Sequence, residues 1–247
     1  METWRFIIDS SRAGALNMAV DRALAVGAAE TELTTLRVYS FSPPAITIGR
    51  FQAIEEFIDL AVCEKEGIDV VRRPTGGLAI LHMNDFTYSV TSPATSSHPI
   101  VRDKSFKMLS GGIVEALRCL GLATEIVSHG VQTGCDGWCF GREFGVDIEW
   151  RSRKICGSAS RIADGALLQH GSLFFNDNSA FLRRVSTRAS TDLSEHVPVS
   201  LREACGREIT WLEVAAAFQD GFSRALGIEF ETAEVTVAEL EMAARRM

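Results

Sequence analysis

The protein has 247 residues, a formal net charge of −7 and 46% hydrophobic residues, which is enough apolar material for a buried core. The acidic balance argues against broad, non-specific binding of nucleic acid, which relies on several Lys or Arg neutralising phosphates. No signal peptide and no run of roughly 20 apolar residues is present, so we expect a cytoplasmic protein with no membrane partner and with reduced thiols rather than disulfides.

The first half of the chain is rich in predicted strands bounded by turn residues. The expected elements are strands over 4–8, 36–41, 45–51, 68–72 and 85–91 and helices over 13–29 and 57–66. Asp9, Ser10 and Ser11 offer capping groups for the first helix. Pro43 and Pro44 separate two strands and predict a hairpin-like turn. The connections are too short for repeated βαβ crossovers, which favours a mixed or antiparallel sheet.

The second half predicts strands over 123–128, 145–150, 154–160, 166–175 and 228–235 and helices over 104–120, 211–226 and 237–246. Thr210 and Glu213 form the pattern of a capping box before the helix over 211–226. Between the first two strands of this half lies a long loop, a place where functional side chains concentrate. We therefore expect an α+β fold with helices flanking the sheet, in one domain over 1–247 whose segment 176–247 is mostly helical.

The stretch from Arg72 to His82 combines two arginines, a paired-glycine turn, an apolar run and a histidine. Gly76 and Gly77 remove every Cβ from a short piece of backbone, so a ligand can lie directly against its amides. The spacing matches neither a Walker motif nor a dinucleotide-binding motif. Cys135 and Cys139 are four residues apart, but no second pair lies at zinc-site spacing, so we expect no metal.

Cysteine suits the transfer of an acyl group, because its thiolate attacks a thioester easily and leaves easily when an amine attacks. A cation such as Lys154 favours the thiolate and stabilises the oxyanion of the tetrahedral intermediate. Cys63 and Cys119 lie in predicted helices and Cys205 in the mostly helical segment 176–247, and all three are interpreted as small buried hydrophobic residues.

Three motifs in order resemble the biotin and lipoate protein ligase superfamily. They are Arg72-Arg73-Pro74-Thr75-Gly76-Gly77 with His82, then Lys154-Ile155-Cys156-Gly157-Ser158-Ala159, then His170-Gly171. The resemblance extends over nearly the whole chain, from Trp4 to about Leu226. It implies the catalytic-domain fold of that superfamily, which is similar to that of class II aminoacyl-tRNA synthetases.

Within the superfamily, the chain is most similar to the cysteine-dependent octanoyltransferases of lipoate assembly, which keep a Cys-Phe pair where Cys139-Phe140 stands. The resemblance implies that Cys139 accepts octanoate from an acyl carrier protein and passes it to a lysine of a lipoyl domain. Such a domain occurs in the glycine cleavage H protein and in the E2 subunit of 2-oxoacid dehydrogenases. Lys154 would support both steps. A second octanoyltransferase branch places its cysteine three residues before the His-Gly pair, where this chain has Leu167.

The resemblance also implies a substrate-binding set. Its members are Arg72, Arg73, Thr75, Gly76, Gly77, Ala79, Leu81, His82, Gly157, Ser158, Ala159, His170 and Gly171. Strand alternation puts Gly77, Ala79 and Leu81 on one face, and this smaller face leaves room for an extended alkyl chain. The same alternation puts His82 on the opposite face, unless the chain bends there.

The leading hypothesis is an acyltransferase that needs no cofactor. One alternative is a lipoate-protein ligase that uses ATP and Mg²⁺, with Lys154 holding the acyl-adenylate. Another is an amidotransferase that moves the acyl group between two lipoyl domains. A catalytically silent carrier-binding module is a further possibility, because Met83 stands where the superfamily usually has Asp after the motif histidine, and the first acid is Asp85.

Overall fold

The computed structural model describes residues 2–53, 58–94, 102–128, 138, 146–187 and 198–247. The strands are β1 (Glu2–Ile8), β2 (Thr35–Tyr39), β3 (Ala45–Ile48), β4 (Asp69–Arg72), β5 (Ile80–His82), β6 (Asp85–Pro93), β7 (Glu125–Ser128), β8 (Val146–Trp150), β9 (Arg153–Ala163), β10 (Ala166–Phe174) and β11 (Ile228–Ala233). The helices are α1 (Gly14–Thr31), α2 (Leu60–Lys65), α3 (Arg102–Cys119), α4 (Ser179–Val185), α5 (Leu201–Cys205), α6 (Trp211–Leu226) and α7 (Val237–Ala244).

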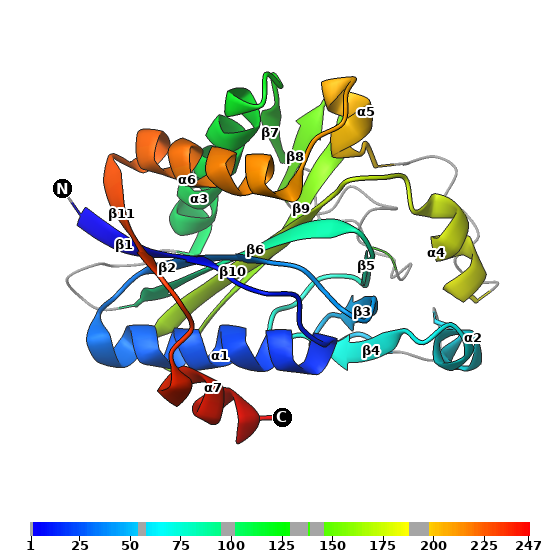
Figure 1. Ribbon diagram of the computed structural model, residues 1–247, viewed down its shortest axis with the longest axis horizontal. Helices are drawn as coiled ribbons and strands as arrows, with labels where there is room; N and C mark the ends of the chain where they lie inside the picture. The colour runs from blue at the N-terminus through cyan, green and yellow to red at the C-terminus, as the bar shows by residue number, and fades with distance from the viewer. Residues whose placement is uncertain (1, 54–57, 95–101, 129–137, 139–145, 188–197) are drawn as a thin grey trace.

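Two sheets account for the strands of the described residues. The main sheet has eight strands in the order β11-β1-β2-β6-β10-β9-β8-β7, and a small sheet has three in the order β4-β3-β5. The three strands from β11 to β2 run parallel and the remaining pairs of the main sheet are antiparallel. Figure 1 shows α3 and α6 on one face of the main sheet and α1 with α7 on the other. This arrangement confirms the expected α+β fold with a mixed sheet flanked by helices.

The two faces of the main sheet differ in chemistry because side chains alternate along each strand. On β6, Phe86, Tyr88 and Val90 belong to the core cluster beneath α3 and α6. Between them, Thr87 and Ser89 are also buried, and the Ser89 hydroxyl donates to Asp21 of α1 over 2.8 Å. One face therefore packs an apolar core, whereas the face toward α1 carries buried polar groups.

The apolar core joins α3 and α6 at close range. Phe218 and Phe222 of α6 pack against the sheet, and a Cβ built on Gly221 would lie 2.3 Å from the backbone N of Ala116 in α3. Glycine at position 221 therefore lets the two helices approach. The capping box expected at the start of α6 is confirmed, since Thr210 accepts from the Glu213 N–H and Glu213 accepts from the Thr210 N–H.

Two local predictions in the first half are wrong. The strands around Ser42-Pro43-Pro44 do not form a hairpin, because β2 pairs with β1 and β6 while β3 pairs with β4 and β5. The capping prediction for α1 also fails, since Ala13 is the N-cap and makes no side-chain capping bond. Asp9 instead pairs with Arg12 and Arg37 at 2.8 and 2.7 Å.

The C-terminal portion of the chain contributes to the main sheet as well as to its helical cover. β11 pairs in parallel with β1, and Phe230 contacts Trp4 and Phe6 with ring centroids 6.3 and 5.4 Å apart. Glu239 of α7 forms an ion pair of 2.6 Å with Arg5 of β1. The first and last segments of the chain are therefore held side by side (Figure 1).

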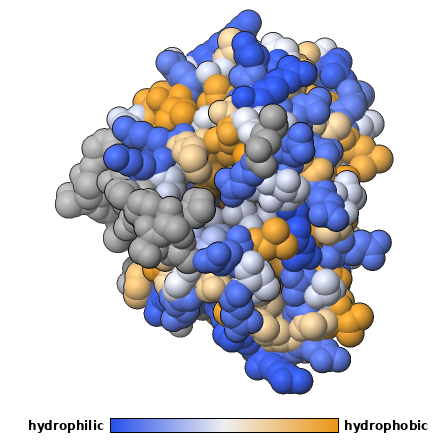
Figure 2. All heavy atoms as spheres, turned by 90° about the vertical axis from the view of Figure 1, so that its left-hand side faces the viewer, coloured by the Kyte–Doolittle hydropathy of each residue, from blue (hydrophilic) through white to orange (hydrophobic). Residues whose placement is uncertain are grey.

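Among the described residues, no helix is both long enough and apolar enough to cross a bilayer. Figure 2 views the molecule from the left-hand side of Figure 1. On this face, hydrophobic residues lie in small groups separated by hydrophilic ones.

Candidate functional site

A cavity of about 20 Å³ lies between the main sheet, the small sheet and α1. Arg73, Ile80 and His82 contribute to its wall from the motif stretch, and Ala159 and His170 contribute from β9 and β10. A volume of this size is enough for about one water molecule. The structure thus brings the three sequence motifs together at one place, although they lie up to 98 residues apart in sequence from Arg73 to Gly171.

His170 links the motif turn to α1 through both ring nitrogens. Its Nε2 lies 2.6 Å from Thr75 Oγ1 and its Nδ1 lies 3.2 Å from Asp21 Oδ2. Burial lowers the pKa of His170 below its ordinary value, although the Asp21 carboxylate acts in the opposite direction. The neutral imidazole therefore predominates at neutral pH, with one nitrogen donating and the other accepting.

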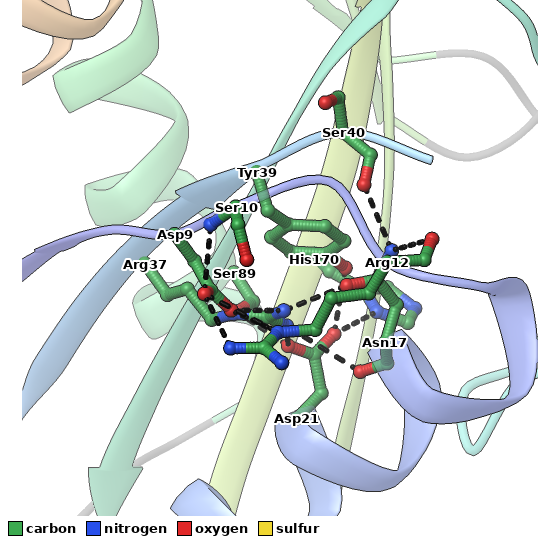
Figure 3. A network of polar contacts seen from close by, with 10 residues as sticks. All are labelled: Asp9, Ser10, Arg12, Asn17, Asp21, Arg37, Tyr39, Ser40, Ser89 and His170. Atoms are coloured by element: carbon green, nitrogen blue, oxygen red, sulfur yellow. Dashed lines mark hydrogen bonds and ion pairs between the residues drawn. The ribbon is translucent and has the colours of Figure 1, made fainter. Parts of the chain in front are cut away.

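His170 belongs to a buried network of charged and polar side chains, which Figure 3 shows close together. They come from the segment after β1, from α1, and from β2, β6 and β10. The fully buried Arg37 guanidinium forms ion pairs of 2.8 Å with Asp21 and 2.7 Å with Asp9. Burial would by itself raise the pKa of Asp21, but the hydrogen bond with His170 and the charge of Arg37 lower it below its ordinary value. Tyr39 donates to Asp21 over 2.8 Å, and burial with the Asp21 charge raises the pKa of Tyr39.

Sequence reasoning missed this network, which has no motif of its own. The signal that could have revealed it is on α1, where Asn17 and Asp21 interrupt an apolar face at a spacing of four residues. Residues spaced by four share a helix face, so both side chains are carried into the interior together. Such buried polar groups are stable only when other buried groups pair with them.

The two motif arginines differ in burial and in the carbonyl groups to which they donate. Arg73 is buried and donates to the carbonyls of Gly76 and Leu78, at 2.7 Å each from Nη2, so it fixes the turn over the cavity. Arg72 is exposed, and its Nη1 donates to the carbonyls of Gly49, Arg50 and Gln52. The structure therefore places Arg73 at the cavity and Arg72 outside it.

Glycine is required at two of the predicted positions. Gly77 has φ of +89°, a backbone conformation that other residues adopt only with strain. A Cβ on Gly171 would lie 2.5 Å from the Gly157 carbonyl oxygen and 2.8 Å from the Tyr88 ring. These glycines shape the backbone around the cavity rather than contribute side chains to it.

The face of the motif strand that lines this cavity differs from the face expected to receive the alkyl chain, and substrate binding by Ala79 and Leu81 stays a prediction. Ile80 and His82 line the cavity, whereas Ala79 and Leu81 belong to a separate core cluster with Trp138. Alternation holds, but the small sheet packs its Ala79 and Leu81 face onto α2 and α4, which leaves the other face for the cavity. His82 thus lies at the site without any bend in the strand.

His82 is held by partners on two sides. Its Nδ1 lies 2.7 Å from Asp85 Oδ2 and its Nε2 lies 2.9 Å from Thr47 Oγ1, while its ring stacks on Phe41 at 3.9 Å between centroids. Asn84 takes a left-handed conformation with φ of +50°, and the resulting turn brings Asp85 back to His82. An acid three residues after the histidine therefore contacts it, although Met83 follows it directly.

The β9 motif is split between the two faces of the sheet. Ala159 lines the cavity, but the Ser158 hydroxyl lies 2.8 Å from the Tyr88 hydroxyl, which belongs to the cluster beneath α3 and α6. Alternation turns the Ser158 side chain away from this cavity, and a role of Ser158 in binding substrate stays a prediction. Gly157 pairs in register with Ser172 of β10, a residue of the cavity wall.

Lys154 is buried at the start of β9, and its Nζ lies 2.7 Å from Asp147 Oδ1 on β8. Among the residues that the structure describes, it is not part of the cavity wall. Its position five residues before Ala159, the β9 residue of the cavity wall, puts it about 16 Å along the strand from the cavity, at about 3.3 Å per residue.

The predicted nucleophile Cys139 lies outside the described residues. Its neighbour Trp138 is described: it is buried and forms a parallel β-bridge with Ala79 of the motif stretch. Of the other cysteines, Cys63 is buried and its pKa is raised to about 11 by burial and by the charge of Asp59. Cys119 is exposed, so its interpretation as a buried residue is wrong.

No group of three His, Cys, Asp or Glu side chains that could hold a metal ion occurs within the described part of the chain. The prediction that the protein needs no metal or other cofactor is not tested by this observation. It stays a prediction, as does the ATP and Mg²⁺ requirement of the alternative ligase.

Comparison with known proteins identifies the family. Residues 13–223 match the lipoyl protein ligase A/B catalytic domain. The chain belongs to this family.

Two relatives in the family are similar over nearly the whole chain. An octanoyltransferase LipM of Carboxydothermus hydrogenoformans is 34% identical over 253 residues, covering 98% of this chain and 93% of the relative. An octanoyltransferase LipM of Bacillus subtilis is 30% identical over 257 residues, covering 97% and 92%.

Solved structures of family members share the fold. A putative lipoate protein ligase of T. acidophilum with bound lipoic acid is 26% identical with a TM-score of 0.81. A lipoate-protein ligase A bound with ATP is 25% identical with a TM-score of 0.83. Each alignment covers 99% of this chain and 94% of the solved chain. The resemblance stated from the sequence motifs is thereby confirmed.

Proposed function

We propose that the protein is an octanoyltransferase of protein lipoylation, which moves an octanoyl group from an acyl carrier protein through Cys139 to a lysine of a lipoyl domain. The observation that carries the proposal is its similarity, at 30–34% identity over nearly the full length, to proteins named octanoyltransferase LipM. The acceptor lipoyl domain is one such as that of the glycine cleavage H protein or a 2-oxoacid dehydrogenase E2.

The position of Trp138 supports a role for Cys139 next to the acyl group. The β-bridge between Trp138 and Ala79 anchors the residue before Cys139 to the stretch that forms one wall of the cavity. In the proposed reaction, the Cys139 thiolate attacks the carbonyl carbon of the octanoyl thioester, a C–S bond forms, and the carrier thiol leaves. The lysine amine then attacks the same carbon, a C–N bond forms, and the Cys139 thiol is released.

Lys154 supplies a positive charge for both tetrahedral intermediates. Its buried ion pair with Asp147 keeps the ammonium oriented, and a low-dielectric surrounding strengthens its interaction with an oxyanion. The transfer needs no ATP, because the thioester is already activated, so we propose that no cofactor takes part.

The cavity receives the acyl chain in this proposal. Apolar groups of Met18, Ile80 and Ala159 line it, and Arg73 holds the turn that closes it. An octanoyl chain is much larger than about 20 Å³, so the cavity has to widen when the chain binds. Arg73 and the Thr75–His170 hydrogen bond hold the motif turn beside the cavity.

An ATP-dependent lipoate ligase is the second candidate. The specific observation in its favour is the fold similarity, at a TM-score of 0.83, to a lipoate-protein ligase A bound with ATP. The two functions differ in the activated donor, since the ligase makes an acyl-adenylate and the transferase starts from a thioester. An amidotransferase between two lipoyl domains differs again, because its donor is an octanoylated lipoyl domain.

The deciding experiment is intact mass spectrometry of the purified protein after incubation with octanoyl carrier protein and no ATP. We expect an octanoyl adduct on the wild type and on Cys119→Ala, and none on Cys139→Ala. Cys119 is the matched control, because it is an exposed thiol that unspecific acylation would modify. An adduct that persists in Cys139→Ala would rule out the proposed nucleophile.

Three donors are then compared for octanoylation of a lipoyl domain. Octanoylation of the lipoyl domain from octanoyl carrier protein alone supports the transferase. Octanoylation that requires free octanoate with ATP identifies the ligase. Octanoylation only from a second, octanoylated lipoyl domain identifies the amidotransferase. We expect Lys154→Ala to lower transfer sharply while circular dichroism shows a folded protein. A Lys154→Ala protein that is folded and fully active would contradict the role of this lysine.

A further inference from the structure

An arginine-rich groove of about 460 Å³ lies beyond the cavity, between α1, the motif stretch and the turn that joins β9 to β10. Six arginines from separate segments line it, namely Arg22, Arg50, Arg72, Arg73, Arg161 and Arg246. Asp164 is the single acidic residue among its lining residues in the described part of the chain. The protein as a whole has a net charge of −7, so this groove is a local concentration of positive charge.

Three basic side chains outside the groove are paired with carboxylates in the structure. Arg153 pairs with Glu203, Lys154 pairs with Asp147, and Arg184 pairs with Glu66. In the groove, by contrast, Arg22 and Arg161 form no ion pair with any carboxylate of the described residues. Their charges are therefore open to a ligand.

Arg72 is pre-organised to bind an anion. Its Nη1 lies 2.8, 3.1 and 2.9 Å from the carbonyl oxygens of Gly49, Arg50 and Gln52, which fixes the plane of the guanidinium. Its Nε and Nη2 have no hydrogen-bond partner among the described residues. A guanidinium held in this way loses little side-chain entropy when it binds phosphate or carboxylate in a bidentate manner.

The groove is separate from the proposed transfer chemistry. Arg161 follows Lys154 by seven residues on β9, which corresponds to about 23 Å at about 3.3 Å per residue. The two regions are nevertheless connected, because Arg73 lines both the groove and the cavity. Arg161 also donates to the Pro74 carbonyl of the motif turn, at 3.4 Å.

We propose that this groove binds a compact phosphate-bearing small molecule, and that its occupancy affects the acyl cavity through Arg73 and the motif turn. Guanidinium groups that converge from several segments on a concave site fit a small polyanion better than the broad surface of an acidic protein. The proposal goes beyond the proposed function, because the transfer of an octanoyl group requires no ligand at this place.

The test is calorimetric titration with pyrophosphate as the probe, at low and at high salt. We expect binding with a stoichiometry of one that weakens as salt increases. Arg22→Ala and Arg161→Ala should each weaken binding by about tenfold, the scale of one charge-assisted hydrogen bond. Arg183→Ala on α4 is the matched control, since Arg183 is exposed, lies outside the groove, and should leave affinity unchanged.

Further titrations separate the possible sources of the anion. Coenzyme A tests a free phosphate ester, and acyl carrier protein with and without its phosphopantetheine arm tests a protein-borne one. Binding of pyrophosphate and coenzyme A that both groove variants weaken supports the proposal. Binding of the carrier alone, equal with and without the arm and lost in the variants, would overturn it in favour of an acidic protein surface. Pyrophosphate affinity that is equal in wild type and in an Arg22→Ala, Arg161→Ala double variant would also overturn it, and circular dichroism of the variants shows that they are folded.

Discussion

At the scale of single residues, the site depends on buried charges that are paired with one another. Arg37 forms ion pairs with Asp9 and Asp21. Asp21 also forms a hydrogen bond with Nδ1 of His170, and Nε2 of the same ring forms one with Thr75. Removing one member leaves a buried charge or dipole without its partner, which costs more free energy than the interaction itself contributes. The histidine at the cavity is therefore fixed in orientation and in protonation state by residues that never contact the cavity.

The lowered pKa of His170 predicts an acid-sensitive stability. The unfolded chain takes up a proton near about pH 6.5, whereas the folded protein resists protonation, so the free energy of unfolding falls as pH decreases below that value. The slope contributed by one histidine is at most about 1.4 kcal/mol per pH unit.

We expect His170→Gln to be less stable than the wild type at about pH 8, where only hydrogen bonds are lost, and to show a smaller decrease toward about pH 5. Urea denaturation at a series of pH values gives both quantities. The other four histidines are the same in both proteins, so their contributions cancel. Parallel pH profiles of the two proteins would contradict the lowered pKa, because they would mean that His170 has the same pKa in the folded and in the unfolded chain.

At the scale of secondary-structure elements, the helices on the apolar face are positioned by glycine. Gly221 of α6 lies against the backbone of Ala116 in α3, and Gly112 of α3 faces the Phe222 ring. The apolar stripes of both helices predict that they are buried, but they do not predict which positions must lack a side chain. That depends on the distance between the two helix axes.

A pair of glycine substitutions tests this packing. Gly221→Ala should lower the free energy of unfolding by about 1–3 kcal/mol, because its Cβ would overlap Ala116. Gly111→Ala should raise it by about 0.4–1 kcal/mol, because nothing lies within 4 Å of a Cβ there and alanine restricts the unfolded chain. Chemical denaturation measures both, and equal effects at the two positions would contradict the close contact of α3 and α6.

At the scale of the whole molecule, the two ends of the chain complete the main sheet together. β11 covers the edge of β1, and α7 packs on α1 through a cluster that includes Ile7, Val20 and Ala243. An exposed β1 would present an unpaired edge with large apolar side chains. The C-terminal segment is thus part of the same sheet as the N-terminal strand, while the prediction of one domain over 1–247 stays a prediction.

Two truncations distinguish the contributions of these elements. Removal of residues 236–247 should leave a folded protein with a lower denaturation midpoint, because α7 and the Arg5–Glu239 ion pair are lost. Removal of residues 228–247 should abolish cooperative unfolding, because β1 then becomes an edge strand and Phe6 loses its contact with Phe230. Circular dichroism during denaturation follows both, and a cooperative transition in the longer truncation would show that β11 is dispensable.

The fold class, most of the elements and the motifs that meet at the cavity can be predicted from the amino-acid sequence alone. These features depend on local periodicity and on residue types at short spacing, as in the alternating strand β6 and the capping box of α6. The tertiary structure decided which face of the motif strand lines the cavity, why Asp21 and Arg37 are buried, and that arginines from distant segments meet in one groove. Those outcomes depend on how sheets and helices pack. A shift of one residue in the register of a strand moves each of its side chains to the opposite face of the sheet.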